Sequence, residues 1–384
     1  MRAATLLALI PLAVAAPAKR SSPAPLLVPR GAQLVEGKYI VRMKDDVQLA
    51  AVDSAIASIR ADADYTYTHS FNGFAASLSA EELQKLQNDP SVDSIEQDAI
   101  VTITATQENA DWGLSRLSSK KAGTTTYTYD DSAGEGTCAY IIDTGIDAKH
   151  PEFEGRAKFL TNLSGDGKDV DGHGHGTHVS GTIGSKTYGV AKKTKLFGVK
   201  VLNSQGQGTN SAVIAGMDFV AKDAAKQDCP KGVVANMSLG GSKSAQVNAA
   251  AAAVVKANVF LAVAAGNESR DAETSSPASE ASACTVGATD KTDALASYSN
   301  FGALVDVLAP GTDIKSTWPG GKTNTISGTS MASPHVAGLG AYLLGLGNVK
   351  AADVCATLAK TALKGAIDGV PSGTANLLIN NGEQ

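Results

Sequence analysis

The sequence predicts an α/β protein with a doubly wound, mostly parallel sheet, preceded by a small α+β unit. Two observations support this prediction. After Thr104, continuous apolar runs alternate with helix-length segments, which is typical of parallel strands buried on both faces. Before Thr104 the strand-like runs alternate between apolar and polar residues, and no cysteine occurs there. A chain of 384 residues is long enough for both units.

The small unit is expected over residues 37–104. Its strands are predicted at "KYIVRMK", "SFNGFAASLS" and "VDSIEQDAIVTI". Helical spacing is found from Val47 to Arg60 and again in "AEELQKLQND", which Pro90 closes. This order fits a split βαβ, ferredoxin-like unit without an obvious catalytic group.

The large domain is expected over residues 105–384, which is near the upper size for one core. Buried strands are predicted at "CAYIID", "KLFGVKVL", "GVVANMSL" and "VFLAVAA". Helices are predicted at "SAVIAGMDFVAKDAAKQ" and "AQVNAAAAAVVKAN".

The N-terminus has the pattern of a secretory signal over residues 1–16. One arginine precedes an apolar run from Ala3 to Ala16 that ends in small residues. Residues 17–36 are rich in Pro, Ala and Ser and are predicted to be a linker. No later apolar stretch is long enough to span a membrane. We therefore expect a secreted, extracellular protein with no membrane partner.

Charge and cysteine content narrow the class further. With 33 Lys and Arg against 38 Asp and Glu, the chain has no strong charge that would favour nucleic acid. Four cysteines in an exported chain favour two disulfides, and their spacing leaves three pairings open. A zinc site is the alternative, but no two cysteines have the close spacing usual for one. They are Cys138, Cys229, Cys284 and Cys355.

The stretch "DVDGHGHGTHVSGTIG" places His173, His175 and His178 within six positions. Such a cluster could bind zinc, or one member could be a catalytic base. In open α/β sheets, reacting groups gather beyond the carboxyl ends of the strands. "CAYIID" ends in Asp143, and Ser330 comes just before the predicted helix "MASPHVAGLGAYLLGL". A serine nucleophile needs an imidazole to take its proton and a carboxylate to orient that imidazole, so these residues could form a catalytic triad.

Several separated motifs resemble those of subtilisin-like serine proteases. They are "YIIDTGID", "HGTHVSGT", "NMSLGG", "AVAAGNE" and "GTSMASPHVAG". "WGLSRLSS", "HPEFEGRA", "YGVAKKTKLFGVKVL" and "CPKGVV" resemble the proteinase K branch. The resemblance extends from about Ala105 to the C-terminus, and residues 37–104 resemble the family's inhibitory propeptide. Motifs in the right order are far more specific than any one of them.

The resemblance implies a role for each candidate. Asp143 is expected to orient His175, the general base, and Ser330 to be the nucleophile, in the Asp, His, Ser order of subtilisin. Asn267 is expected to donate to the oxyanion. Each could instead be a turn, cap or loop residue. Of the other histidines, His173 is expected in a solvated loop, and His69, His150, His178 and His335 are expected to be structural.

Two polar, glycine-rich segments are expected to bind substrate as added strands. In the family, such segments pair with the main chain of an extended peptide. The first is "LNSQGQGTNS", with Gly206 and Gly208, and the second is "SLGG". Ordinary loops are the alternative. Small, uncharged residues beside the oxyanion site indicate an apolar residue before the cleaved bond. The remaining residues predicted to contact substrate are Ser238, Leu239, Gly240, Ala264, Ala265 and Gly266.

The resemblance also implies disulfides and an ion. It pairs Cys138 with Cys229 and Cys284 with Cys355. Calcium is the family's usual ion, and one strong structural site is expected at the carboxylate of Asp306 and the backbone carbonyls of Ala281 and Ala283. A second site known in relatives needs an aspartate where this chain has Ala366.

Together these features predict a broad-specificity serine endopeptidase that hydrolyses peptide bonds through an acyl-enzyme. We expect a monomer, made as a precursor that cuts itself near Thr104 or Ala105 and is inhibited by its own propeptide. Its other partners would be protein and peptide substrates. The rival hypotheses are a zinc hydrolase built on the three clustered histidines and a catalytically inactive binding protein with the same fold.

Overall fold

A computed structural model describes residues 22–29, 34–102, 106–107, 112–347 and 349–382. The predicted signal sequence and the expected cleavage point at Thr104 or Ala105 lie outside the described residues. Within the described part of the chain, no helix has the length and apolar character needed to cross a membrane.

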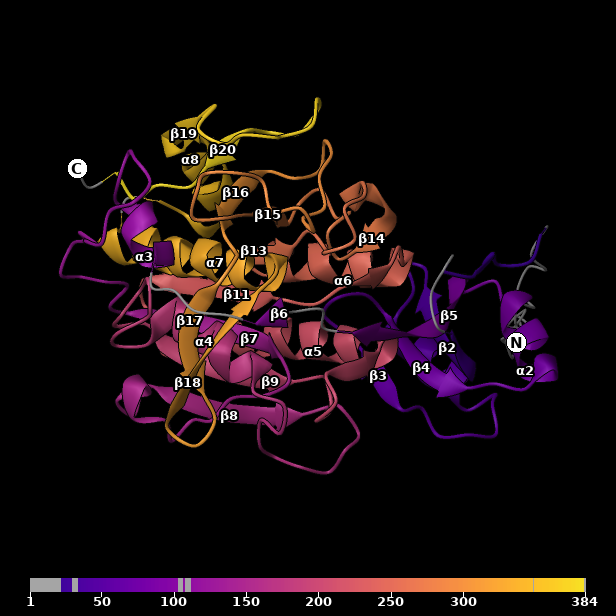
Figure 1. The fold of residues 1–384 in the computed structure, drawn as a ribbon. Coiled ribbons are helices and arrows are strands. Elements are labelled where there is room, and N and C mark those ends of the chain that lie inside the picture. Colours follow the sequence, from indigo (N-terminus) through magenta and orange to yellow (C-terminus); the bar gives the residue numbers. More distant parts are fainter. Residues whose placement is uncertain (1–21, 30–33, 103–105, 108–111, 348, 383–384) are drawn as a thin grey trace, which may run out of the picture.

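The large domain is built on a nine-stranded sheet (Figure 1). All neighbouring strands pair in parallel except β19 and β20. From β7 the sheet grows through β9 to β8 on one side and through β11 and β13 on the other, so the strand order reverses at β7. In order across the sheet, the strands are β19 (Leu363–Lys364), β20 (Leu377–Leu378), β16 (Val307–Pro310), β15 (Cys284–Thr289), β13 (Val259–Ala264), β11 (Gly232–Met237), β7 (Thr137–Asp143), β9 (Lys195–Lys200) and β8 (Ala157–Asn162).

Helices cover both faces of this sheet. Neighbouring residues of β7 alternate between two cores: Ile141 packs in the core that includes α4 and α7, and Ile142 packs in the core that includes α5 and α6. Burial on both faces explains why the strands are continuous apolar runs. The helices are α3 (Trp112–Leu117), α4 (His175–Gly184), α5 (Asn210–Asp223), α6 (Ala245–Lys256), α7 (Thr329–Leu346) and α8 (Val354–Thr361). The smaller strands are β6 (Thr106–Gln107), β10 (Gln207–Thr209), β12 (Gly241–Ser242), β14 (Ser275–Ser276), β17 (Ile314–Trp318) and β18 (Lys322–Ser327).

The small unit has its own sheet and core, in the strand order β1-β5-β2-β4-β3. Its second helix begins with a capping box between Ser79 and Glu82. Part of the predicted linker over residues 17–36 belongs to this sheet instead. Strand β1 forms an edge of the sheet by pairing with β5, and β2, which begins at Leu34, also pairs with β5. The elements are β1 (Leu26–Leu27), β2 (Leu34–Met43), α1 (Leu49–Ile56), β3 (Tyr65–Tyr67), β4 (Gly73–Ser77), α2 (Ala80–Gln87) and β5 (Val92–Thr102).

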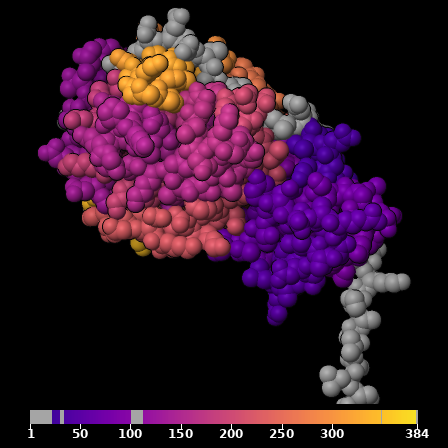
Figure 2. All heavy atoms as spheres, turned by 90° about the horizontal axis from the view of Figure 1, so that it is seen from below, coloured from indigo at the N-terminus to yellow at the C-terminus, as the bar shows by residue number. Residues whose placement is uncertain are grey.

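The small unit packs against α5 and α6 as a separate lobe (Figures 1 and 2). Its strand β5 pairs antiparallel with β10 of the large domain. The hydroxyl of Tyr67 donates to the carbonyl oxygen of Ser211 at 3.1 Å. In the same direction, the backbone N–H groups of Thr68, His69 and Ser70 donate to Asp218 of α5.

Helix α7 begins two residues earlier than the sequence predicted, which places Pro334 in its second turn rather than its first. A proline there cannot donate the usual hydrogen bond to the residue four positions before it. The carbonyl oxygen that loses this partner belongs to Ser330, and it accepts a bond of 2.6 Å from Ser238 Oγ instead. This hydrogen bond, which Pro334 makes possible, connects the first turn of α7 to the end of β11.

Candidate active site

Asp143 and His175 meet at the carboxyl end of the sheet. Asp143 is the last residue of β7, and His175 is the first residue of α4. The imidazole Nδ1 lies 2.8 Å from Oδ1 and 3.0 Å from Oδ2 of Asp143. Both side chains are buried. A proton on Nδ1 donated to the carboxylate leaves Nε2 as the basic nitrogen.

Ser330 lies in the first turn of α7 and is 3% exposed. Its Oγ donates to the carbonyl oxygen of Ser238 at 3.2 Å. The Nε2 atom of His175 is buried, and among the described residues it has no hydrogen-bond partner. Bonds between a base and its nucleophile are often long before substrate binds. The imidazole nitrogen is thus available to exchange a proton.

Asn267 follows β13 and is held by the start of α7. Its Oδ1 accepts from the backbone N–H of Thr329 at 2.8 Å and from Thr329 Oγ1 at 2.9 Å. Since these two donors fix the oxygen end of the amide, the Nδ2 end points away from them. An amide group fixed in this way is a preorganised donor for negative charge.

Asp171 is a buried residue of this site that the sequence reasoning missed. Its Oδ1 accepts from Thr144 Oγ1 at 2.8 Å and from the N–H of Gly174 at 2.7 Å. Its Oδ2 accepts from the N–H and the hydroxyl of Thr177 at 2.8 and 2.6 Å. This carboxylate joins the residue after Asp143 to the loop and helix that carry His175. Asp171 stands in the stretch "DVDGHGHGTH", but two of its hydrogen-bond donors are the backbone N–H groups of Gly174 and Thr177, which no sequence pattern indicates.

The glycines of this loop are required by close packing. Gly174 has φ of +106°, and a Cβ there would lie 2.3 Å from the Trp318 ring. A Cβ on Gly176 would lie 2.1 Å from the carbonyl oxygen of Gly145. Only glycine lets α4 approach the end of β7 so closely.

The other two clustered histidines have different surroundings. His178 is fully buried, its Nε2 bonds to the carbonyl oxygen of Ile314 at 2.9 Å, and burial lowers its pKa to about 3. His173 is half-buried rather than solvated, and its backbone N–H donates to Asp171 Oδ1 at 3.1 Å. Burial lowers the pKa of its imidazole. In the described ranges, no group of histidines is close enough to share one metal ion. The geometry therefore gives no support to the zinc alternative.

The predicted substrate segments lie around this site. Gly208 of β10 pairs with Val101 of β5, so the small unit occupies the first segment as an added strand, and Gly206 turns into it with φ of +73°. Ser238 and Leu239 are buried, and Gly240 leads into β12. Ala264 and Ala265 are buried at the end of β13, and the N–H of Gly266 donates to Thr329 Oγ1 at 3.1 Å.

The four cysteines form Cys138–Cys229 and Cys284–Cys355, the two pairs that the resemblance implies. Asp306 lies beside the second disulfide, whose bonded sulfurs are not free to bind metal. Its Oδ2 accepts from the N–H of Thr285 at 2.8 Å, and burial raises its pKa. Within the described part of the chain this carboxylate has no ion-pair partner. Ala283 is buried just before β15, and Ala281 is exposed.

Comparison with known proteins identifies relatives of both units. The Subtilase family matches residues 134–378, and Peptidase inhibitor I9 matches residues 38–104. The chain is 55% identical to a cuticle-degrading protease of Metarhizium anisopliae over 100% of both chains. It is 71% identical to proteinase T of Parengyodontium album, over 75% of this chain and 98% of that protein.

A solved structure shares the fold. The crystal structure of a cold adapted subtilisin-like serine proteinase matches with a TM-score of 0.67 and 41% identity, over 71% of this chain and 99% of the other. The fold and the catalytic class expected from the sequence are thereby confirmed. The chain belongs to the subtilase family, in its proteinase K branch, and is a serine endopeptidase made with an inhibitory propeptide.

Proposed function

We propose that Ser330 is the nucleophile of this peptidase, with His175 as its base and Asp143 as the carboxylate that orients the base. The observation that supports this most strongly is the buried pair of His175 and Asp143, whose remaining imidazole nitrogen has no partner among the described residues. A nitrogen of this kind can take the proton of an attacking hydroxyl.

In the first half of the reaction, Ser330 Oγ attacks the carbonyl carbon of the peptide bond as its proton passes to His175 Nε2. Asp143 stabilises the imidazolium that forms. The carbonyl oxygen becomes an oxyanion, which receives hydrogen bonds from Asn267 Nδ2 and from the backbone N–H of Ser330. That N–H lies in the first turn of α7, where amide groups have no partner within the helix.

The first half ends as His175 gives its proton to the leaving amine and the peptide C–N bond breaks, which leaves an acyl group on Ser330 Oγ. In the second half, water attacks the acyl carbon as His175 takes a proton from it. Collapse of the second tetrahedral intermediate returns the proton to Ser330 and releases the acid.

The same site is proposed to cut its own chain near Thr104 or Ala105. Strand β5 already pairs with β10 as an extended peptide would, with Thr102 opposite Gln207. After cleavage, residues 37–104 would remain bound as a product-like inhibitor, and residues 105–384 would form the enzyme. The first residue of the mature enzyme follows from the position of this cut.

Substrate preference is proposed to be broad, with an apolar residue before the cleaved bond. Pairing through main-chain groups tolerates many side chains. Ala264, Ala265 and Gly266 offer neither charge nor bulk beside Asn267, which favours an apolar side chain there.

Three further features belong to this proposal. The signal-like residues 1–16 support secretion. The carboxylate of Asp306, together with the carbonyls of Ala281 and Ala283, would hold one structural calcium ion. The enzyme would act as a monomer.

One experiment separates this proposal from its rivals. The processed enzyme is treated with a serine-directed sulfonyl reagent, and the adduct and the N-terminus are mapped by mass spectrometry. We expect loss of activity in proportion to label on Ser330, and an N-terminus near Ala105. Inactivation by a chelator without any effect of the reagent would favour a metal hydrolase, and a precursor that never processes would favour an inactive binding protein.

A further inference from the structure

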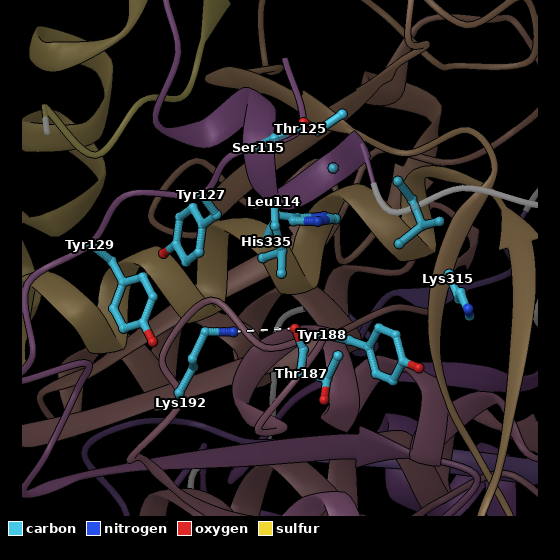
Figure 3. Close-up of a pocket in the computed structure, with 12 residues that line it drawn as sticks. Leu114, Ser115, Thr125, Tyr127, Tyr129, Thr187, Tyr188, Lys192, Lys315 and His335 are labelled. Atoms are coloured by element: carbon cyan, nitrogen blue, oxygen red, sulfur yellow. Dashed lines mark hydrogen bonds between the residues drawn. The ribbon is translucent and has the colours of Figure 1, made fainter. Parts of the chain in front are cut away.

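A pocket of the peptidase domain is lined by none of the residues predicted to contact substrate (Figure 3). It has a volume of about 280 Å³ and opens between α3, the loop after α4 and the start of β17. The middle of α7 forms its base through His335. All of its lining residues belong to the part of the chain that remains after removal of the propeptide.

Aromatic rings and lysines form the walls of this pocket. The rings of Tyr127 and Tyr129 are stacked, with centroids 5.0 Å apart. Lys192 Nζ lies 5.6 and 5.4 Å from the two ring centroids, and Figure 3 shows its side chain reaching from these rings toward Thr187. On the other side, Lys315 Nζ lies 5.8 Å from the ring centroid of Tyr188.

The lining carries positive charge without a carboxylate. Among the described residues, neither Lys192 nor Lys315 forms an ion pair, and no Asp or Glu lines the pocket. Glu152 exerts a favourable charge effect on Lys192, but its carboxylate accepts bonds from the N–H and hydroxyl of Thr187. Lys192 donates only to backbone carbonyls, those of Lys186 at 3.1 Å and Thr187 at 3.2 Å.

Burial makes this arrangement costly for the charged form of Lys192. Desolvation lowers the pKa of its ammonium to about 8, although the aromatic faces and the two carbonyls favour the charge. An anion in the pocket would supply the missing partner. The inner surface beside it is apolar and uncharged, because Leu114 and Ile314 line it and burial holds the pKa of His335 at about 4.

We propose that this pocket binds a small aromatic carboxylate, with the carboxylate at Lys192 and the ring between the tyrosines and Leu114. Paired charge supplies specificity for the anion, and the tyrosine faces supply the contact area for a flat ring. This site is separate from the triad, and its binding does not depend on turnover.

Two sources could supply this chemistry: a free aromatic acid, or the new C-terminus of a peptide that ends in an aromatic residue. Benzoate represents the first and N-acetylphenylalanine the second. Benzamide and N-acetylphenylalanine amide are their neutral counterparts of nearly equal shape.

The test is calorimetric titration of the full chain carrying Ser330→Ala, in which β5 stays against β10 and cannot be digested. We expect benzoate to bind with a dissociation constant on the order of 1 mM or below, and benzamide at least tenfold more weakly. Lys192→Gln should weaken benzoate tenfold or more, whereas Lys256→Gln, an exposed lysine on α6, should change it less than twofold. Equal binding of acid and amide, no binding at about 10 mM, or an unchanged Lys192→Gln variant would overturn the proposal.

A second readout does not depend on the folding of that variant. Because an anion raises the pKa of Lys192, benzoate should bind with uptake of a fraction of a proton at pH 8, measured by comparing buffers of different ionisation enthalpy. Lys192→Arg should keep the binding and lose the proton uptake. Binding without uptake in the parent chain would contradict the role of Lys192. If N-acetylphenylalanine competes with benzoate, the ligands of this pocket include peptides that end in an aromatic residue. If benzoate alone binds, the ligands are free aromatic acids.

Discussion

At the scale of single residues, the candidate site is a small set of hydrogen bonds with little redundancy. Asp143 orients His175, Thr329 orients Asn267, and Ser238 replaces the partner that Pro334 removes from α7. The first relation was expected from the resemblance, whereas the contact between Thr329 and Asn267 was not predicted. The third could not be predicted, because it depends on the register of the helix that contains the proline.

Asn267→Ala should reduce kcat by roughly 10² to 10³ with little change in KM. This range is the one known for the equivalent donor in subtilisin. The amide bond to the oxyanion strengthens as charge develops, so its loss affects the transition state more than the bound substrate. Steady-state kinetics with a short peptide substrate measures both constants, and a kcat within a few-fold of the parent enzyme would contradict the assignment.

Asp171→Asn should reduce kcat about 10- to 100-fold, because an amide cannot accept all the bonds that hold Thr144, Gly174 and Thr177. A displaced His175 should also move the acidic limb of the kcat/KM profile. Asp169→Asn is the matched control, since the same charge is lost from an exposed residue of the same loop. Equal profiles for the two variants would assign Asp171 a purely structural role.

At the scale of elements, the sequence predicted the buried strands β7, β9, β11 and β13 and the helices α5, α6 and α7, because their apolar patterns are long. It did not predict α4, which is rich in Gly, Ser and Thr, nor α8 and the short buried strands β15 and β16. It missed β1 and β3, which are short and exist through pairing with neighbouring strands. Carboxylates of β5 bind the first turns of two peptidase helices: Asp98 accepts from Ser211, and Glu96 from Ser244 and Gln246. These contacts cross the border between the two units, and no local pattern indicates them.

The affinity of the propeptide for the enzyme should fall as pH rises. Burial against α6 raises the pKa of Glu96 from 4.5 to about 7, so the complex holds a proton that the free propeptide releases. Binding is therefore strongest below about pH 4.5 and weakens until the pH passes about 7. Burial raises the pKa of Asp98 as well, which acts in the same direction.

Inhibition constants of the isolated propeptide, measured from pH 5 to 8, check this dependence. We expect an increase of about tenfold or more over that range. Glu96→Gln should flatten the curve, whereas Glu81→Gln, at an exposed position of the same propeptide, should leave it as it is. Tighter inhibition at pH 8 than at pH 5 would show that the sign is wrong.

At the scale of the whole molecule, one doubly wound sheet carries Asp143 and Asn267 at the same edge, and α4 and α7 bring His175 and Ser330 to it. The sequence predicted this arrangement because parallel strands end on one side. It did not predict where the pocket around Lys192 lies, since its lining residues come from five separate segments.

Removal of calcium should lower the temperature of inactivation and leave the initial rate at 25 °C nearly unchanged. An ion that binds only the folded state stabilises that state without taking part in the chemistry. Thermal inactivation with and without a chelator measures the effect, and Asp306→Asn should remove the difference. If the chelated and calcium-loaded enzymes inactivate at the same rate, Asp306 does not hold a calcium ion.

The most direct test of the whole account is the fate of the precursor when Ser330 is changed to alanine. If Ser330 performs both the first cut and later turnover, the Ser330→Ala chain should keep its propeptide covalently attached. Its hydrolysis of peptides should fall to the residual level of about 10³ to 10⁴ over water that the oxyanion site and binding supply. Intact mass and peptide hydrolysis, measured on parent and variant expressed side by side, give both values. A variant that processes itself as fast as the parent would contradict the assignment of Ser330 as nucleophile.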